Sequence, residues 1–321
     1  MPRRRPQSFG EFIGQPRVVD YLSGLIAGSL ELQLPCPPLW IKGGTGMGKT
    51  TLARACAAQY GSDLHVLIGD PDVSPKQAVE ALGHMDFGDF LFIDEAHTLP
   101  RAVQELLCQA LDDEKVPVPD KAGDAGSVFQ SIAAFSLVVA TTKPSGLIPA
   151  FRSRLLPVEL APYTPLELAA IARRVAEQSG RELTAQAANA LAELPLLTPR
   201  RIEHYLDELA RFFPGHTHLG VRELQELFRH KGISAQGLGP WHRRYLRILE
   251  ASPRHTASMH RLAKAIGVDD RASIGEDVEP LLLHLALVDI TAGNQRRLTP
   301  AGAAALANFP GEPDADQKKS A

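Results

Sequence analysis

The stretch "GGTGMGKTT" at 43–51 constrains the fold of this chain more than any other feature. It matches G-x-x-x-x-G-K-[ST] through Gly43, Gly48, Lys49 and Thr50, directly after the apolar run "PLWIK" and directly before "TLARACAAQ". A plain glycine-rich turn would explain the glycines but not the Lys-Thr pair. The stretch therefore predicts a nucleotide phosphate site, with backbone N–H groups around the phosphates, Lys49 as a point charge and Thr50 as a Mg²⁺ ligand.

Around this loop, short apolar runs alternate with helical patterns up to residue 161, which predicts an α/β fold with a parallel sheet. The expected strands are 38–42, 65–68, 90–94 and 136–140. The clearest helix is "RAVQELLCQALDDE", whose apolar residues recur at helical spacing. We expect a nucleotide-binding domain at 1–161.

The remainder of the chain has a different pattern. Only helical patterns occur up to about 232, and the glycines of "GISAQGLGP" then mark a linker. Helical patterns at 241–250 and 258–266 precede "VEPLLLHLALVDI", a turn "AGN" and "RRLT", an order typical of a winged-helix domain. The expected parts are an all-α lid at 162–235, a winged-helix domain at 236–309 and a disordered tail at 310–321.

Composition sets limits on location and partners. No apolar run approaches the roughly 20 residues of a membrane helix, and the basic start has no apolar stretch behind it, so we expect a cytoplasmic protein with no membrane partner. Cys36, Cys56 and Cys108 lie far apart without metal-ligand spacing, and we expect buried free thiols. With a net charge of −3, any DNA-binding surface must be local.

Carboxylates and hydroxyls follow two of the expected strands. Asp94 ends "LFID", where a carboxylate can hold Mg²⁺, and Glu95 after it can polarise the attacking water. Thr141 and Thr142 end "VVATT", where a hydroxyl can touch the γ-phosphate. Asp94 to His97 also spell the DEAH box of a helicase superfamily, but those enzymes need two tandem nucleotide folds, and this chain has room for one. For His97 we favour a capping role at the turn over direct catalysis.

This order of motifs resembles the AAA+ ATPases, and within them the RuvB family of branch-migration motors. The similarity runs from residue 4 to 309 through "RRPQSFGEFIGQPRVV", "GMGKTTLA", "LFIDEAHTL", "ALDDEKV", "ATTKPSGLIPAFRSRL", "TPRRI" and "IGEDVEPLLLHLALVDIT". The resemblance implies ATP and Mg²⁺ as cofactors, and it implies contacts with the nucleotide or its metal by Arg4, Arg5, Pro6, Gly46, Lys49, Thr50, Thr51, Asp94, Asp112, Asp113 and Tyr163. Glu114 stands where the family has an aromatic residue in that acidic segment.

The resemblance also implies the catalytic set. Glu95 matches the catalytic carboxylate, Thr142 or Thr141 the first sensor, and Arg200 the second sensor, which reaches the γ-phosphate of its own subunit. For Arg200 the alternative is a solvated charge at a helix start.

Two further arginines stand in the apolar stretch 147–160, where Glu159 is the only nearby carboxylate. Arg154 matches the arginine finger that acts in trans on a neighbouring subunit's ATP, and Arg152 a companion at the same interface. The resemblance therefore implies a homo-oligomer, a hexameric ring, in which another chain compensates both cations. The alternative is a pair of solvated surface arginines.

Two segments depart from the family pattern. Residues 116–135 stand where the family has a β-hairpin that engages a RuvA protein, but the basic character usual there is missing. Val128, Phe129 and Ile132 fit an apolar hairpin tip and core positions equally well. The wing reads "TAGNQRRLT", with Arg296 and Arg297 adjacent as the expected DNA contacts, and 241–309 carries nine Lys or Arg against seven Asp or Glu.

The leading hypothesis is an ATP-hydrolysing ring motor that moves along double-stranded DNA and drives branch migration of four-way junctions. Two alternatives stay open. One is a non-translocating AAA+ switch of the helicase or clamp-loader type, and the other is a RuvB relative on a mobile element with a partner other than RuvA.

Overall fold

The structure, a computed structural model, describes residues 6–119, 127–267, 273–307 and 309. It divides into two compact units, the first made of Met1–Glu167 with Thr198–Arg201 and the second of Leu168–Leu197 with Ile202–Ala321. The expected lid and winged-helix segments thus share one unit, and the boundaries at 161, 235 and 309 stay predictions. The expected tail at 310–321 lies outside the described residues.

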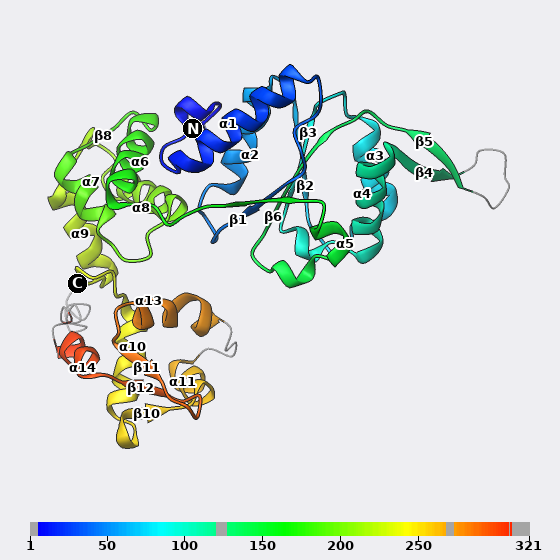
Figure 1. Ribbon diagram of the computed structural model, residues 1–321. Coiled ribbons are helices and arrows are strands. Elements are labelled where there is room, and N and C mark those ends of the chain that lie inside the picture. Colours follow the sequence, from blue (N-terminus) through cyan, green and yellow to red (C-terminus); the bar gives the residue numbers. More distant parts are fainter. Residues whose placement is uncertain (1–5, 120–126, 268–272, 308, 310–321) are drawn as a thin grey trace. The chain divides into compact units, whose positions relative to one another are not determined.

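A five-stranded parallel sheet forms the centre of the first unit, in the order β2–β3–β6–β1–β7 (Figure 1). Its strands are β1 (Leu39–Lys42), β2 (Leu64–Ile68), β3 (Phe90–Asp94), β6 (Ser136–Thr141) and β7 (Leu156–Glu159). The first four coincide with the expected runs, which confirms the α/β class. We did not predict β7, because only Val158 among its four residues is buried at this edge of the sheet.

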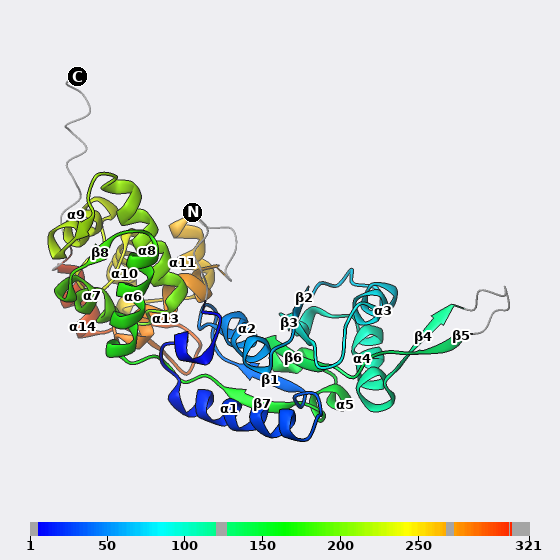
Figure 2. The ribbon, with the colours of Figure 1, turned by 90° about the horizontal axis from the view of Figure 1, so that it is seen from above.

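Helices cover both faces of this sheet, because successive strand residues point to opposite sides. Ile41 and Phe92 pack with α1 (Pro16–Glu31), α2 (Lys49–Tyr60) and η1 (Phe9–Glu11). Trp40 and Ile93 face the other side, which is covered by α3 (Pro75–Gly83), α4 (Arg101–Asp113) and α5 (Pro149–Arg152). Figure 2 shows α1 and α2 on one side of the strands and α3 and α4 on the other. Cys36, Cys56 and Cys108 are buried free thiols, as expected.

The parallel order brings the carboxyl ends of the strands to one edge of the sheet. β1 leads into the glycine-rich loop, β3 ends at Asp94, and β6 ends at Thr141. Two short 3-10 turns follow the latter strands, η2 (Ala96–Thr98) and η3 (Pro144–Gly146). The predicted nucleotide-binding residues therefore meet at this edge.

A β-hairpin follows α4, made of β4 (Lys115–Pro119) and β5 (Ser127–Ser131) in antiparallel register. Figure 1 shows it extending away from the sheet. Val128 and Phe129 on β5 are 49% and 55% exposed, whereas Ile132 is half-buried against the core below α3 and α4. Each alternative therefore holds for part of the set: Val128 and Phe129 belong to an exposed hairpin, and Ile132 belongs to the core.

The second unit begins with a helical part. Its helices are α6 (Pro165–Gln178), α7 (Ala185–Ala192), α8 (Pro199–Phe212) and α9 (Val221–Lys231), the first turns of α6 and α8 belonging to the first unit. A short parallel pair, β8 (Glu182–Leu183) with β9 (His218–Leu219), joins their connections. All four helices are amphipathic and bury their apolar faces, as the sequence pattern indicates.

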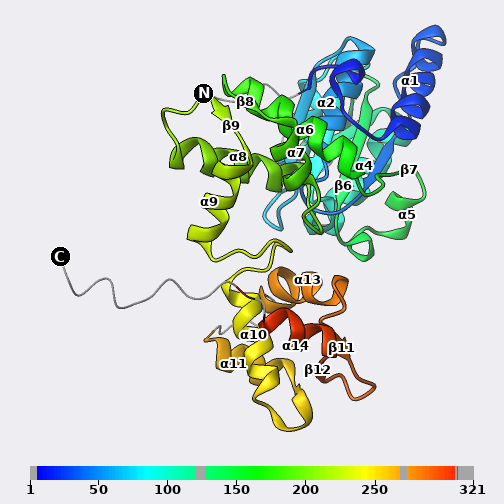
Figure 3. The same ribbon diagram turned by 90° about the vertical axis from the view of Figure 1, so that its left-hand side faces the viewer.

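The winged-helix part has a separate core around Tyr245, Leu249, Leu262 and Leu282. It contains α10 (Pro240–Glu250), η4 (Pro253–His255), β10 (Thr256–Ala257), α11 (Met259–Ile266), the π-turn η5 (Ile274–Val278), α13 (Glu279–His284), β11 (Val288–Ile290), β12 (Arg296–Leu298) and α14 (Pro300–Ala307). β10 adds a third strand to the expected two-stranded wing, in the order β10–β12–β11. Figure 3 shows α10, α11 and α14 packed around it.

Candidate functional site

The predicted phosphate loop joins β1 to α2. Gly46 and Gly48 have φ values of 77° and 92°, in the left-handed region that favours glycine. A Cβ atom on Gly46 would also lie 2.7 Å from the Cβ atom of Arg200. Because α2 begins at Lys49, the N–H groups of its first turn lack helical partners and are available to an anion at this loop.

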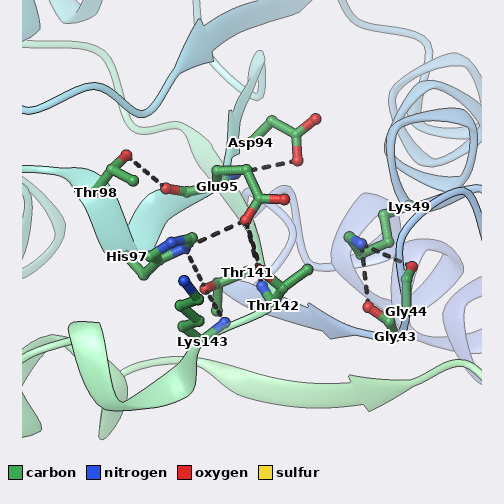
Figure 4. A network of polar contacts seen from close by, with 10 residues as sticks. All are labelled: Gly43, Gly44, Lys49, Asp94, Glu95, His97, Thr98, Thr141, Thr142 and Lys143. Carbon is green, nitrogen blue, oxygen red and sulfur yellow. Dashed lines mark hydrogen bonds and ion pairs between the residues drawn. The ribbon is translucent and has the colours of Figure 1, made fainter. Parts of the chain in front are cut away.

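Lys49 is the first residue of α2, directly after the loop, and is 7% exposed. Its ammonium donates hydrogen bonds to the carbonyl oxygens of Gly43 at 3.1 Å and Gly44 at 3.0 Å (Figure 4). Burial lowers the pKa of Lys49, and the negative charges of Asp94 and Glu95 oppose this effect. The loop therefore holds one ammonium opposite two carboxylates, an arrangement suited to a nucleotide phosphate with a divalent cation.

The oxygen donors expected for Mg²⁺ are Thr50 and Asp94. Thr50 lies in the first turn of α2 next to Thr51, and both are half-buried. Asp94 ends β3, and its Oδ1 accepts the N–H of Glu95 at 3.1 Å. A hydroxyl and a carboxylate are the hard oxygen ligands that Mg²⁺ prefers, so the donor chemistry fits this ion.

Glu95 has a left-handed backbone, with a φ of 50°. The hydroxyl of Thr142 donates to its Oε2 at 3.1 Å, and the Thr142 N–H lies 3.4 Å from the same oxygen (Figure 4). The sequence left Thr141 and Thr142 as alternatives for the first sensor. Thr142 contacts Glu95, whereas the Thr141 hydroxyl lies 3.0 Å from His97 Nδ1 and accepts the N–H of Lys143.

His97 is closer to the carboxylate than the sequence indicated. Its Nδ1 lies 3.2 Å from Glu95 Oε2 and 3.0 Å from Thr141 Oγ1. We expected only a cap at the turn after β3, since a single histidine after "DEA" carries no information on its neighbours in the fold. The imidazole instead joins the end of β3 to the end of β6 beside Glu95.

Tyr163 and Arg200, which lie far from the phosphate loop in the sequence, both contact it, as the resemblance led us to expect. The Tyr163 hydroxyl donates to the carbonyl oxygen of Met47 at 3.1 Å, and burial raises the pKa of this tyrosine to about 12. The Arg200 N–H donates to the carbonyl oxygen of Gly46 at 3.3 Å, and its side chain is exposed. Both segments belong to the first unit, which brings the two predicted residues to the loop.

The N-terminal segment is attached by Gln15, which we did not predict. Its side-chain amide donates to Ala161 O at 2.6 Å and accepts the Ala161 N–H at 2.9 Å, and the residue is 5% exposed. The only signal in the sequence was the family-like segment "RRPQSFGEFIGQPRVV", in which Gln15 follows Gly14. Arg4 and Arg5, the expected base contacts, lie outside the described residues, and Pro6 is half-buried.

The arginine pair differs from the expectation. Arg154 binds Asp112 of its own chain: its Nε lies 2.9 Å from Oδ1 and 3.1 Å from Oδ2, and its Nη2 donates to Oδ2. The expectation that another chain compensates Arg154 was therefore wrong, because α4 supplies a carboxylate 42 residues earlier. Arg152 is exposed, as are Asp113 and Glu114.

This pairing also bears on the nucleotide contact expected from Asp112. Hydrogen bonds from Arg154 lower the pKa of the Asp112 carboxyl group, so it is ionised and occupied by the guanidinium. The carboxylate of Asp112 is thus directed to an arginine rather than held ready for a nucleotide.

Of the two arginines predicted to contact DNA from the wing, one is buried in an ion pair and the other is exposed. Arg296 is only 9% exposed; its Nε donates to Glu279 Oε1 at 2.6 Å and its Nη2 to Oε2 at 3.2 Å. Tyr245 donates to the same Oε1 at 2.6 Å. The prediction that Arg296 contacts DNA was therefore wrong, because Glu279 holds its buried side chain. Adjacent residues of β12 point to opposite faces, so only Arg297 is exposed, where it pairs with Asp289 at 3.1 Å.

Comparisons with known proteins agree with this arrangement. The family profile described as "Holliday junction DNA helicase RuvB P-loop domain" matches residues 4–159, and "RuvB C-terminal winged helix domain" matches 235–307. No helix of the described residues is long and apolar enough to cross a membrane.

Individual relatives extend the match along the chain. The Holliday junction branch migration complex subunit RuvB of Kosmotoga olearia is 33% identical over 294 residues, which cover 88% of this chain and 84% of the relative. That of Helicobacter hepaticus is 28% identical over 90% of this chain and 89% of its own. The solved structure of the Thermotoga maritima RuvB branch migration motor superposes with a TM-score of 0.76 at 28% identity, covering 94% of this chain and 98% of that chain. The chain therefore belongs to the RuvB family, with an N-terminal P-loop ATPase domain and a C-terminal winged-helix domain.

Proposed function

We propose that the chain is an ATP-driven motor that moves the branch point of Holliday junctions on double-stranded DNA. The observation that carries the proposal is the convergence of Lys49, Glu95, Thr142 and Arg200 at one end of a parallel sheet, in a chain that also matches the family's winged-helix domain. The named relatives are branch migration subunits, which supports this substrate.

For the nucleotide, we propose that Lys49 and the loop N–H groups bind the phosphates of ATP. Thr50 and Asp94 would hold Mg²⁺, which supplies positive charge to the β- and γ-phosphate oxygens when bound. Tyr163 supports the loop at Met47 from the connection after β7, and Arg200 contacts the loop at Gly46. The resemblance assigns Arg200 to the γ-phosphate.

For hydrolysis, we propose that Glu95 takes the proton from the attacking water. Its Oε2 is fixed by Thr142, which leaves Oε1 to accept the water proton. The N-terminal end of α2 and Lys49 stabilise the charge that develops on the phosphates. Arg154 would complete the site from a neighbouring subunit of a hexameric ring, as the resemblance implies.

For partners, the hairpin of β4 and β5 is the proposed contact with a RuvA protein. Val128 and Phe129 are exposed apolar side chains on opposite faces of this hairpin, and either face offers one of them to a partner. Arg297 is the remaining wing arginine for a DNA phosphate, and a contact to the backbone needs charge rather than base readout.

The proposal is tested with a synthetic four-way junction, Mg-ATP and the chain, with and without the RuvA protein of the same source. We expect conversion of the junction to duplex products that requires ATP and is abolished by Lys49→Ala. Failure in both conditions, with ATPase activity intact, would contradict the motor and favour a non-translocating switch. The low exposed charge of the wing is the observation behind that alternative.

A further inference from the structure

The side chain of Arg154 is held from two directions by its own chain. Asp112, in the last turn of α4, accepts from Nε and Nη2, and the carbonyl oxygen of Ala150 on α5 accepts from Nη1 at 2.6 Å. A guanidinium has five N–H donors in one plane. Toward the residues that the structure describes, Nε uses one of them, Nη2 one and Nη1 one, so Nη1 and Nη2 each keep one N–H for another acceptor.

These two remaining donors matter for the proposed role in trans. Asp112 binds the edge of the guanidinium formed by Nε and Nη2, and it therefore fixes the guanidinium plane without using every donor. Nη1 and Nη2 are the terminal nitrogens, which bind phosphate oxygens in the bidentate geometry typical of arginine. Arg154 can thus keep its contact with Asp112 while it binds a phosphate.

The backbone around Arg154 is fixed to the same helix. Gln104 on α4 is 2% exposed; its amide donates to Gly146 O at 3.1 Å and accepts the N–H of Ile148 at 2.8 Å. Phe151 of α5 is fully buried in the core that α4 covers. α4 therefore fixes the segment before α5 through a buried amide and the arginine itself through Asp112.

We propose that Asp112 is a positioning residue for Arg154, which presents the guanidinium of one subunit to the γ-phosphate bound by the next. This inference rests on the proposed trans role of Arg154. It replaces the direct nucleotide contact expected for Asp112. A carboxylate near phosphates is repelled unless a cation neutralises it, and Arg154 supplies that cation.

Kinetics of the ring-forming chain provide the first test. Arg154→Ala should lower kcat by about 10³-fold or more, the contribution of an arginine finger. Asp112→Ala should lower kcat by about 10²-fold, as expected when a catalytic group is misplaced by about 1 Å, with ATP affinity unchanged. Added to Arg154→Ala, it should cause no further loss, because both changes remove the same function. Asp112→Glu should recover part of the activity.

A matched control is Glu105→Ala. Glu105 lies on the same helix, is exposed, and pairs with Arg101 at 2.7 Å, so its removal deletes a similar arginine–carboxylate contact outside the site. This variant should keep the wild-type kcat. Equal losses from Glu105→Ala and Asp112→Ala would mean that α4 is merely sensitive to lost ion pairs, and they would overturn the inference.

Mixing inactive variants separates the possible roles of Asp112. If subunits assemble at random, about a quarter of the interfaces combine an intact phosphate loop with an intact finger. Arg154→Ala mixed with Lys49→Ala should therefore recover ATPase activity. Asp112→Ala should recover activity with Lys49→Ala and fail to recover it with Arg154→Ala. A residue that contacts the nucleotide of its own subunit would give the reverse pattern.

The mixtures also distinguish two failures. If Arg154→Ala and Lys49→Ala restore nothing together, the trans role in the proposed function is wrong. If that pair recovers activity but Asp112→Ala with Lys49→Ala does not, only the positioning role is wrong. Thermal unfolding of each variant alone must match the wild type, and Asp112→Asn, which keeps the shape of the side chain, replaces Asp112→Ala if that variant is unstable.

Discussion

The buried ion pair of the wing gives the most quantitative prediction. Arg296→Ala removes two hydrogen bonds to Glu279, at 2.6 and 3.2 Å, and leaves a carboxylate that is 5% exposed with Tyr245 as its only remaining partner among these three residues. Hydrogen bonds to charged groups contribute roughly 1.5–3 kcal/mol each. Breaking a buried pair on one side costs about 3–5 kcal/mol. We expect a loss of about 3–5 kcal/mol in the winged-helix part.

Hydrogen–deuterium exchange of the full chain measures this loss locally. The protection of amides in α10 and α13 should fall, while that of the parallel sheet should not change. The matched control is Arg297→Ala, which removes the exposed pair with Asp289 and should change stability by no more than about 0.5 kcal/mol. Equal effects of the two substitutions would refute the structural role of Arg296.

An apolar replacement checks the physical reason. In the triple variant Tyr245→Phe, Glu279→Met and Arg296→Met, no buried polar group of this cluster is left without a partner. Such replacements of buried ion pairs are neutral or stabilising by about 1–4 kcal/mol. The triple variant should therefore regain most of the protection that Arg296→Ala loses. If it is less stable than Arg296→Ala, an unpaired Glu279 is not the cause of the loss.

For DNA binding the expected order is reversed: the loss of Arg297 should alter the salt dependence of the affinity, and the loss of Arg296 should not. Each phosphate contact contributes about 0.9 to the slope of log affinity against log salt concentration. Arg297→Ala should reduce that slope by about one, whereas Arg296→Ala, measured where the domain is still folded, should leave it unchanged. A reduced slope in Arg296→Ala would restore the original prediction of a DNA contact.

Three further changes test the first unit. His97→Ala should lower kcat, measured at saturating ATP, about tenfold, which is the value of one hydrogen bond to the Glu95 carboxylate. His97→Asn should retain activity, because the amide nitrogen of asparagine can replace Nδ1. Tyr163→Phe should weaken ATP binding about fivefold in nucleotide titrations through the lost support of the loop. Burial raises the pKa of the Asp89 carboxyl group, but hydrogen bonds from backbone N–H groups and from His65 outweigh burial and lower this pKa. The ionised carboxylate therefore stabilises the fold fully above about pH 4, and this stabilisation is lost as the pH falls through the lowered pKa. Urea unfolding should show a gap between wild type and Asp89→Asn at pH 7 that closes in acid.

The central sheet was predictable because its inner strands are covered on both faces and are nearly continuous apolar runs. β3 and β6 bury almost every residue, which leaves a clear signal. β7 lies at the edge and buries only Val158, so its sequence resembles a loop. The limit is physical: a strand with one buried residue has no periodicity from which it can be recognised.

The site was predictable where its residues stand in short motifs beside strand ends. Lys49, Asp94 and Thr142 come together because parallel strands end at one edge. The contacts of His97, Gln15 and Asp112 depend on how distant segments pack, and nothing in their own neighbourhoods encodes a partner 42 to 146 residues away. Adjacent arginines were equally ambiguous, because only the face of β12 decides which of them is buried.

The pairing of Arg154 with Asp112 alters the case for a ring. A pair of cations without nearby carboxylates in the sequence first suggested that a second chain must neutralise them. Since Asp112 already compensates Arg154 within one chain, the charge of Arg154 by itself gives no reason for assembly. The geometry of the guanidinium is compatible with the proposed trans role, because it is fixed on one edge and keeps a donor on each terminal nitrogen. Any arginine paired through Nε and Nη2 keeps such donors, including one that serves only to join α4 to α5. Mixed rings, rather than charge counting or donor counting, therefore decide whether Arg154 completes a neighbouring site.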